Sequence, residues 1–398
     1  MTSVVSDLRV LRGNLWRGGG VPQERGRGCG GKRPCLPCLE RKRSGASLCS
    51  PSRPFRTSKQ DQLSRWFYVL PLIDKYGRDI HDLRISITDR CNYKCVYCRS
   101  GNNGPSFPEM PIADYLRMVS VFVGLGIRKV RLTGGEPLLR RGLVDMVREL
   151  GQMRTRAGER LDIAITTNGH LLAELAQALA EAGLARVTVS MDAVEPHHFA
   201  RITRVPNGYE RVLAGIRAAR RAGLNPVKVN CVLLRGFNDD QITGFGRFAR
   251  DEGVVVRFIE FMPLEEDRVW SPQIVVRLDE IVERMAEFMP LREIDHQRSE
   301  TARRYLFQDG VGEIGIIAPV SHPFCGQCSR IRVTSDGKIR TCLFSIREYD
   351  LAELMARGAS DEDMADFIRQ AIDHKEARHH IGEPGFVPAS RTMVHIGG

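Results

Sequence analysis

Short apolar runs alternate with longer amphipathic segments from about residue 69 onward. Six runs have the length and β-branched composition of strands, and they span residues 83–88, 130–133, 163–167, 187–192, 227–234 and 254–262. Helical patterns separate these runs, and several end in glycine, which commonly stops a helix. The alternation predicts an α/β fold with a parallel sheet and right-handed crossovers, either an open doubly wound sheet or a full or partial barrel.

The alternation stops beyond about residue 280. Residues 304–320 and 329–344 each have a hairpin pattern, and residues 361–380 have a helical pattern. The second hairpin is expected to turn at Asp336-Gly337. We therefore predict a basic extension at 1–66, an α/β core at 67–290 and a smaller α+β unit at 291–398.

The positive charge of the chain is concentrated near its amino end. Residues 1–66 contain 14 Lys and Arg against 4 Asp and Glu, whereas the remaining 332 residues contain 45 against 44. The Gly, Pro and Arg content of 1–66 predicts disorder. A zinc site at Cys29, Cys35, Cys38 and Cys49, a transit peptide and a translated upstream region stay open as alternatives.

The rest of the chain is nearly neutral, so its charge gives no argument for binding nucleic acid. No apolar run approaches the roughly 18 residues that a membrane span needs. We therefore expect neither nucleic acid nor a membrane as a partner.

Polar motifs follow the carboxyl ends of the predicted strands. A cysteine-rich loop follows the first strand, "GGEP" (134–137) the second and "TNG" (167–169) the third. "SMD" (190–192) ends the fourth strand and "EFMP" (260–263) the sixth. Because ligands of parallel α/β folds bind at this edge, we expect these segments to form one site.

Two groups of three cysteines carry the strongest chemical signal. They are Cys91, Cys95 and Cys98, and Cys325, Cys328 and Cys342. A four-iron cluster that only carries electrons usually has four thiolate ligands, so three thiolates leave one iron open. Structural zinc remains an alternative for the first group, and a zinc ribbon or an electron-relay cluster for the second. Cys231 lies alone in an apolar run and is interpreted as a core residue.

The first group, with Tyr97 directly before its third cysteine, resembles the radical S-adenosylmethionine superfamily. In that superfamily the open iron binds the amino and carboxylate groups of S-adenosylmethionine. An electron from the cluster then cleaves the sulfonium and gives a 5′-deoxyadenosyl radical. "GGEP" is similar to the superfamily's element for the methionine amino group.

Much of the chain, roughly residues 72–398, also resembles the GTP 3′,8-cyclase family of molybdenum cofactor biosynthesis. The similarity rests on "LRISITDRC", "RLTGGEPLLR", "TTNG", "VKVN", "RFIEFMP", "FCGQCSRIRVTSDGKIRTCLF" and the terminal Gly397-Gly398. It implies a partial (β/α)6 TIM-like barrel with a smaller C-terminal α+β domain that carries a second cluster. The implied cofactors are two [4Fe–4S] clusters, one at each cysteine group, and S-adenosyl-L-methionine.

The same resemblance implies the ligand contacts. S-adenosylmethionine is expected at Tyr97, Gly135, Ser190 and Met262. GTP is expected at Arg84, Lys129, Arg131, Thr166, Lys228, Arg257, Arg330, Ile331 and Arg332, with its base at the open iron of the second cluster. The residue types agree in part, because a triphosphate carries about four negative charges and the chain has no GxxxxGK[ST] loop to bind them.

A few positions depart from the family or invite other interpretations. Arg99-Ser100 stands where the family commonly has Met-Pro, and Ser329 where it often has Asn. The GxGxxG pattern at 310–315 precedes a β-like run, so we interpret it as a hairpin turn rather than a dinucleotide site. We interpret His197-His198 and His379-His380 as ordinary helix-surface residues.

The resemblance implies a lyase-type enzyme that converts GTP to (8S)-3′,8-cyclo-7,8-dihydroguanosine 5′-triphosphate. It also implies an electron donor such as flavodoxin or ferredoxin, a downstream cyclic pyranopterin monophosphate synthase and a cytoplasmic location, and it allows a homodimer. A peptide-modifying radical enzyme and a zinc protein with a nucleic-acid-binding arm are the alternatives. Because only three cysteines follow residue 300, the C-terminal unit favours a cluster with an open iron.

Overall fold

The computed structural model describes residues 71–98, 107–295 and 299–397. The extension expected at 1–66, with its four cysteines, lies outside these residues. So does the Arg99-Ser100 departure from the family pattern.

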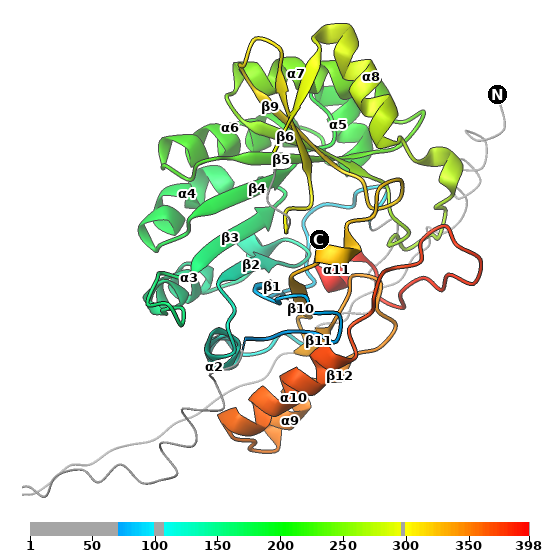
Figure 1. Ribbon diagram of the computed structural model, residues 1–398. Coiled ribbons are helices and arrows are strands. Elements are labelled where there is room, and N and C mark those ends of the chain that lie inside the picture. Colours follow the sequence, from blue (N-terminus) through cyan, green and yellow to red (C-terminus); the bar gives the residue numbers. More distant parts are fainter. Residues whose placement is uncertain (1–70, 99–106, 296–298, 398) are drawn as a thin grey trace, which may run out of the picture. The chain divides into compact units, whose positions relative to one another are not determined.

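A 12-stranded sheet organises this part of the chain, in the order β12-β11-β10-β1-β2-β3-β4-β5-β6-β9-β8-β7. The strands expected from the apolar runs are β1 (Asp82–Ser86), β2 (Lys129–Thr133), β3 (Asp162–Thr167), β4 (Arg186–Ser190), β5 (Lys228–Leu233) and β6 (Val255–Glu260). They pair in parallel in chain order, with Leu83 opposite Val130 and Cys231 opposite Phe258. The predicted α/β fold is confirmed, and the sheet curves into a partial barrel (Figure 1).

Helices connect the parallel strands and cover the outer face of the curved sheet (Figure 1). They are α2 (Ile112–Gly124), α3 (Leu143–Gln152), α4 (Leu172–Glu181), α5 (Pro196–Thr203), α6 (Gly208–Arg221), α7 (Ile242–Asp251) and α8 (Leu278–Phe288). Each buries one apolar stripe at helical spacing, as Tyr115, Met118 and Phe122 do on α2. The covering helices leave the carboxyl ends of the strands facing the C-terminal segments.

The C-terminal strands are β7 (Leu291–Ile294), β8 (Arg303–Phe307), β9 (Glu313–Ile317), β10 (Arg330–Val333), β11 (Lys338–Arg340) and β12 (Tyr349–Asp350). Both predicted hairpins are present, since β8 pairs antiparallel with β9 and β10 with β11. In addition, β9 pairs parallel with β6 and β10 pairs parallel with β1. Strands after residue 290 therefore extend both edges of the barrel sheet, while the domain boundary at residue 290 stays a prediction.

The late helices are α9 (Leu351–Ala356), α10 (Asp361–Asp373) and α11 (Met393–Ile396). A capping box of Ser360 and Asp363 begins α10. The pattern at 361–380 predicts a longer helix than the structure has, since α10 ends at Asp373. The chain then turns toward β10 and β11, and the Lys375 ammonium donates hydrogen bonds to two of their flanking carbonyls.

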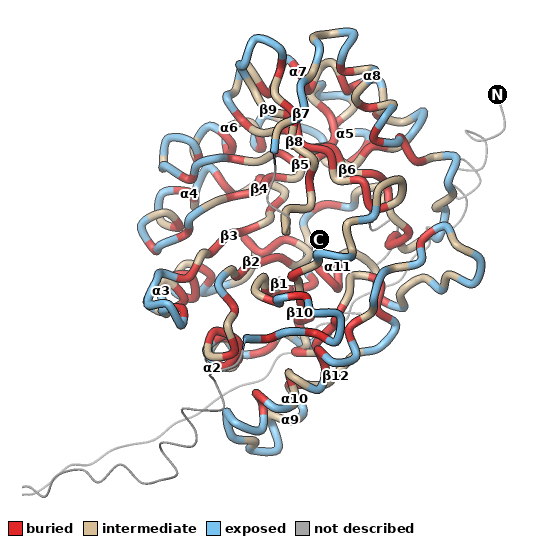
Figure 2. The backbone as a smooth tube through the Cα atoms, in the orientation of Figure 1, coloured by how far each residue is buried: buried red, intermediate tan, exposed pale blue. Residues whose placement is uncertain are grey.

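The core lies between the sheet and its helices, and the strands are its most buried elements (Figure 2). Cys231 has no exposed surface, which confirms it as a core residue. A smaller apolar cluster, made of Leu264, Phe344, Ile381 and Ile396, packs the C-terminal segment near the strand ends. None of the described helices is both long and apolar enough to cross a bilayer.

Candidate active site

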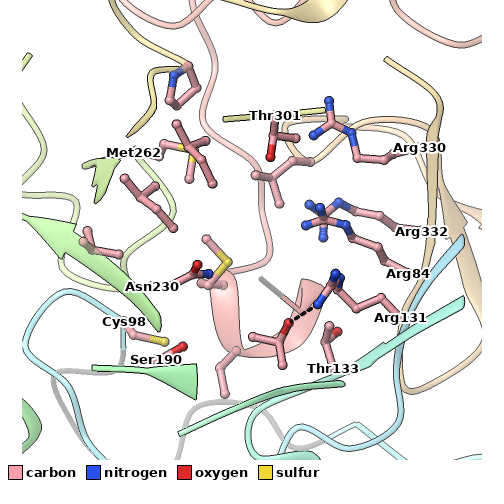
Figure 3. A pocket seen from close by; sticks show the side chains of 18 of the residues that line it. Arg84, Cys98, Arg131, Thr133, Ser190, Asn230, Met262, Thr301, Arg330 and Arg332 are labelled. Carbon is pink, nitrogen blue, oxygen red and sulfur yellow. Dashed lines mark hydrogen bonds between the residues drawn. The ribbon is translucent and has the colours of Figure 1, made fainter. Parts of the chain in front are cut away.

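A cavity of about 280 Å³ lies at the carboxyl ends of the parallel strands. Loops after the barrel strands line it together with segments of the C-terminal unit. Its two sides differ in chemistry (Figure 3). Arg84, Arg131, Arg330 and Arg332 gather on one side, and Cys98, Ser190, Asn230 and Met262 lie on the other.

The loop after β1 carries Cys91, Cys95 and Cys98, and all three side chains line the cavity. The loop is fixed to the end of α5, where the Val96 amide donates a hydrogen bond to the Ile202 carbonyl at 3.0 Å. Burial raises the pKa of the Cys95 thiol well above its usual value, and the Asp192 carboxylate and the other two thiols add to this effect. Buried thiolates here therefore need a cationic partner.

Asp192 links this loop to the strands across the barrel. Its carboxylate accepts a hydrogen bond from the Tyr97 hydroxyl at 2.7 Å and from the Val232 amide at 2.8 Å. The residue is 2% exposed, and burial raises its pKa to about 6 despite these two bonds. At neutral pH Asp192 thus places a negative charge beside the first cysteine group.

The "GGEP" turn packs directly on the beginning of the cysteine loop. Gly134 has a φ of +152°, and a Cβ there would lie 2.3 Å from the Thr88 carbonyl oxygen. A Cβ on Gly135 would lie 2.4 Å from the carbonyl oxygen of Arg90. The Gly135 amide donates to Thr88 at 2.8 Å, so the close approach of the two backbones requires glycine at both positions.

Glu136 of the same turn is buried and accepts several hydrogen bonds. Its carboxylate accepts hydrogen bonds from the Leu138 amide at 2.9 Å, the Thr167 hydroxyl at 2.7 Å and the Asn168 amide at 2.7 Å. Burial raises its pKa to about 7, although these three donors oppose the shift. The Asn168 side chain in turn donates to Asn92 at 2.7 Å. The second and third strand ends are thereby tied to the cysteine loop.

The second group of cysteines lies on the C-terminal unit. Cys325 begins the turn η4 (Cys325–Gln327), Cys328 directly follows it, and Cys342 follows β11. Arg78, which precedes β1, donates to the carbonyl of Cys325 at 2.8 Å. Burial alone would raise the pKa of Cys328, but the cations of Arg330 and Lys375 outweigh it and lower the pKa to about 6. This group therefore lies in a positive environment.

Three residues on the arginine side of the cavity, Arg84, Arg131 and Arg257, are buried close to one another's charges. In the described ranges, no carboxylate lies within 4.0 Å of the guanidinium of Arg84, Arg131 or Arg257. The Nε atoms of Arg84 and Arg257 are buried without a hydrogen-bond partner. Burial, followed by the charges of Arg131 and Arg84, lowers the pKa of Arg257 to about 9. Such a cluster fits a polyanionic ligand.

All but three of the residues predicted for the site line this cavity. The predicted residues that do line it are the six cysteines, Tyr97, Gly135, Ser190, Met262, Arg84, Arg131, Thr166, Arg257, Arg330 and Arg332. The exceptions are Lys129, Lys228 and Ile331. The lysines begin β2 and β5, at the strand ends away from the cysteine loop, and Ile331 has no exposed surface. Their predicted contacts with GTP stay predictions.

The cavity also contains residues that the sequence reasoning did not single out. Asp192 and Asn168 lie in the "SMD" and "TNG" motifs, so the position of these motifs at strand ends was a usable signal. Lys375 gave no such signal. His379 was wrongly placed on a helix surface: it follows the end of α10, lines the cavity and packs against Phe344 at 5.3 Å between ring centroids.

The donor sets fit the cofactors that the sequence implies. At each group, three thiols converge on one cavity. Gly134 and Gly135 line the cavity beside the first group. Three thiolates and an adjacent open space match a cluster with one iron available for a ligand.

Comparison with known proteins assigns the family. GTP 3′,8-cyclase of Corynebacterium glutamicum is 40% identical over 338 residues, which are 82% of this chain and 89% of that protein. GTP 3′,8-cyclases of Rhodopirellula baltica and Heliobacterium modesticaldum are each 39% identical, over 83% and 82% of this chain and 92% and 100% of theirs. The chain belongs to the GTP 3′,8-cyclase family.

Two family models agree with this membership in the GTP 3′,8-cyclase family, and solved structures show a similar fold. The Radical SAM superfamily matches residues 85–249, and Molybdenum Cofactor Synthesis C matches residues 254–381. Streptococcus suis SuiB bound to S-adenosylmethionine has a TM-score of 0.55 at 13% identity, over 79% of this chain and 78% of that one. Native anSMEcpe with bound AdoMet has a TM-score of 0.52 at 16% identity, over 75% and 81%. These solved structures support the fold of this GTP 3′,8-cyclase family member.

Proposed function

We propose that the protein converts GTP to 3′,8-cyclo-7,8-dihydro-GTP with a [4Fe–4S] cluster at each cysteine group and S-adenosylmethionine at the first. The observation that carries this proposal is a cavity lined by both cysteine groups and by a cluster of buried arginines, two of which have an Nε atom without a hydrogen-bond partner. When bound, the first cluster and S-adenosylmethionine supply the chemistry that removes a hydrogen atom from C3′ of the ribose. The protein's own task is then to bind, orient and shield the two ligands.

Arg84, Arg131 and Arg257 are suited to the triphosphate. They line the cavity from β1, β2 and β6, and Arg131 is held by hydrogen bonds to the hydroxyls of Thr166 at 3.3 Å and Thr188 at 3.2 Å. A triphosphate would supply the anionic partner that these buried guanidinium groups lack. Arg330 lies over the Phe324 ring at 4.9 Å beside Cys328, which favours the base of GTP at the second group.

The opposite side of the cavity is suited to S-adenosylmethionine, whose sulfonium and amino groups are cationic. Asp192 supplies a negative charge there, and Ser190 and Met262 line the same side. Gly134 and Gly135 of the "GGEP" turn line the cavity here as well, where the amino group would bind. This distribution of charge would orient the two ligands, with the sulfonium near the carboxylates and the phosphates near the arginines.

The chain end contributes to closing the cavity. Met393 and Val394 of α11 line it, and the Arg332 guanidinium donates a hydrogen bond to the Gly397 carbonyl. A Cβ on Gly397, whose φ is +76°, would collide with the Thr133 hydroxyl. The close approach fits glycine at this position and would help to keep water from the reacting atoms.

The test is anaerobic reconstitution of the full chain with iron and sulfide, followed by GTP, S-adenosylmethionine and a reductant. We expect about eight irons per chain, 5′-deoxyadenosine and a cyclised GTP product. ATP in place of GTP should give little cyclised product. Formation of 5′-deoxyadenosine without cyclised GTP would reject the substrate but keep the radical chemistry, and zinc without iron would reject both.

The remaining expectations concern partners. We infer that a low-potential carrier such as flavodoxin or ferredoxin supplies the electron and that a cyclic pyranopterin monophosphate synthase uses the product. Reconstitution with purified candidates in place of a chemical reductant tests the first inference. Adding the purified synthase and detecting its product tests the second.

A further inference from the structure

Lys375 is a buried cation that none of the predicted site contacts includes. It follows the end of α10 and is 2% exposed. Its ammonium donates a hydrogen bond to the carbonyl of Arg330 at 2.9 Å and another to the carbonyl of Thr341. Arg330 lies two residues after Cys328, and Thr341 directly precedes Cys342. Lys375 therefore bridges the two backbone segments that carry these thiols.

A lysine buried to this extent needs compensation for its charge. Two carbonyl dipoles satisfy two of its three N–H groups. Across the described ranges, no carboxylate lies within 4.0 Å of its ammonium. The carboxylate of the neighbouring residue, Glu376, is engaged by the Thr341 hydroxyl at 2.8 Å. The thiols of the second group line the same cavity as Lys375, so that, bound as thiolates, they would supply the compensating negative charge.

Lys375 also lines the cavity itself, together with Cys325, Cys328 and Cys342. Its ammonium thus lies beside the backbone that carries two of these thiols, on the side of the C-terminal unit.

We propose that Lys375 is a positioning residue of the second cluster, whose charge compensates the bound thiolates and raises the cluster's reduction potential. This inference rests on the proposed function, because it requires a cluster at Cys325, Cys328 and Cys342. An oxidised [4Fe–4S]²⁺ core with three thiolates has a net charge of about −1. One electron from an external reductant brings it to about −2 without making or breaking a bond. A nearby cation stabilises the more negative state, so its removal must disfavour reduction.

The experiment is a redox titration of the second cluster, followed by electron paramagnetic resonance. The full chain carries Cys91→Ala, Cys95→Ala and Cys98→Ala so that only the second cluster contributes a signal. Dithionite with redox mediators is the reductant. The variants are Lys375→Met, which removes the charge, and Lys375→Arg, which keeps it. Lys338→Met is the matched control. Lys338 lies on β11, pairs with Asp350 of β12 at 3.0 Å and does not line the cavity.

In Lys375→Met we expect the ratio of reduced to oxidised cluster at a fixed potential to fall about tenfold, which equals about 59 mV for one electron. Lys375→Arg should restore most of the ratio, and Lys338→Met should leave it unchanged. Retention of the cluster in Lys375→Met with an unchanged potential would overturn the proposal. Equal loss of iron from Lys375→Met and Lys375→Arg would also overturn it, since packing rather than charge would then explain the residue.

Loss of iron from Lys375→Met alone, with iron retained in Lys375→Arg, would support charge compensation directly. The proposed function fails in a different way. If the chain with intact Lys375 binds no iron at the second group, the second cluster itself is absent. Iron content of this parent chain therefore separates the two failures before any potential is measured.

Discussion

The two cysteine groups face one cavity but lie in opposite electrostatic surroundings. The first group has the carboxylate of Asp192 beside it, and burial leaves the pKa of Cys95 far above its usual value. The second group has Arg330 and Lys375, which lower the pKa of Cys328 to about 6. The same number of thiols is thus embedded in a negative environment in one case and in a positive environment in the other.

This difference shows how one cavity can separate two ligands of opposite charge. A sulfonium is favoured beside a carboxylate, and a triphosphate is favoured beside guanidinium groups that lack a carboxylate partner. The thiols supply equivalent metal ligands, so it is the surrounding charge that distinguishes the two proposed sites. The comparison therefore predicts that substitutions on each side affect different steps.

The largest effects are expected from the cysteines themselves. Cys95→Ala should abolish both cleavage of S-adenosylmethionine and cyclisation of GTP, by at least about a thousandfold, because the first cluster starts the reaction. Cys328→Ala should abolish cyclisation while cleavage of S-adenosylmethionine persists. Chromatography of 5′-deoxyadenosine and of the nucleotide product measures both steps. Cys231→Ala, outside the cavity, is the control, and identical product patterns for the two variants would contradict the division of roles.

The next effect concerns the free energy of unfolding and its dependence on the buried carboxylate of Glu136. The folded-state pKa of Glu136, about 7, lies above the ordinary glutamate pKa of 4.5, so the folded chain holds this proton more tightly than the unfolded chain. The free energy of unfolding should therefore fall by about 3 kcal/mol as pH rises from about 4.5 to about 7. Urea unfolding of the metal-free chain at several pH values measures this slope. Glu136→Gln should flatten it, and an equal slope in both proteins would show that the group does not titrate in this way.

A smaller effect is expected on the arginine side. Arg257→Met removes a buried charge that would contact phosphate, so the KM for GTP should rise about 30-fold, equivalent to roughly 2 kcal/mol. Affinity for S-adenosylmethionine should change little. Steady-state kinetics and equilibrium dialysis measure the two quantities. Arg247→Met on α7, which packs on Phe288 outside the cavity, is the matched control. A change in the affinity for S-adenosylmethionine without a change in the KM for GTP would contradict the assignment of the arginine side to GTP.

The smallest effect should come from Asp192→Asn. Loss of its charge should weaken binding of S-adenosylmethionine about tenfold, or about 1.4 kcal/mol, and leave the KM for GTP nearly unchanged. Tyr97→Phe removes only the hydrogen bond to this carboxylate and should weaken binding less. Equilibrium dialysis with both variants measures the difference. Equal losses would indicate that the bond, rather than the charge, matters.

The sequence predicted the barrel strands because their apolar runs depend only on local composition. Leu83 and Ile85 alternate with Arg84, and the buried and cavity-facing sides of β1 follow directly from that alternation. The hairpins and the core position of Cys231 were also predictable from local pattern. By contrast, the helix expected at 361–380 ends at Asp373, because a tertiary contact of Lys375 competes with the helical propensity of the segment.

The sequence by itself determined the parallel α/β core, the two groups of three thiols and the placement of polar motifs at one edge. Each of these features depends on the spacing of residues that lie close together in the chain. Only the tertiary structure decided how β9 and β10 close on the barrel and which charges surround each group. Lys375 and Asp192 lie far along the chain from the thiols that they influence. Such pairings depend on long-range packing and burial, which leave no trace in local periodicity.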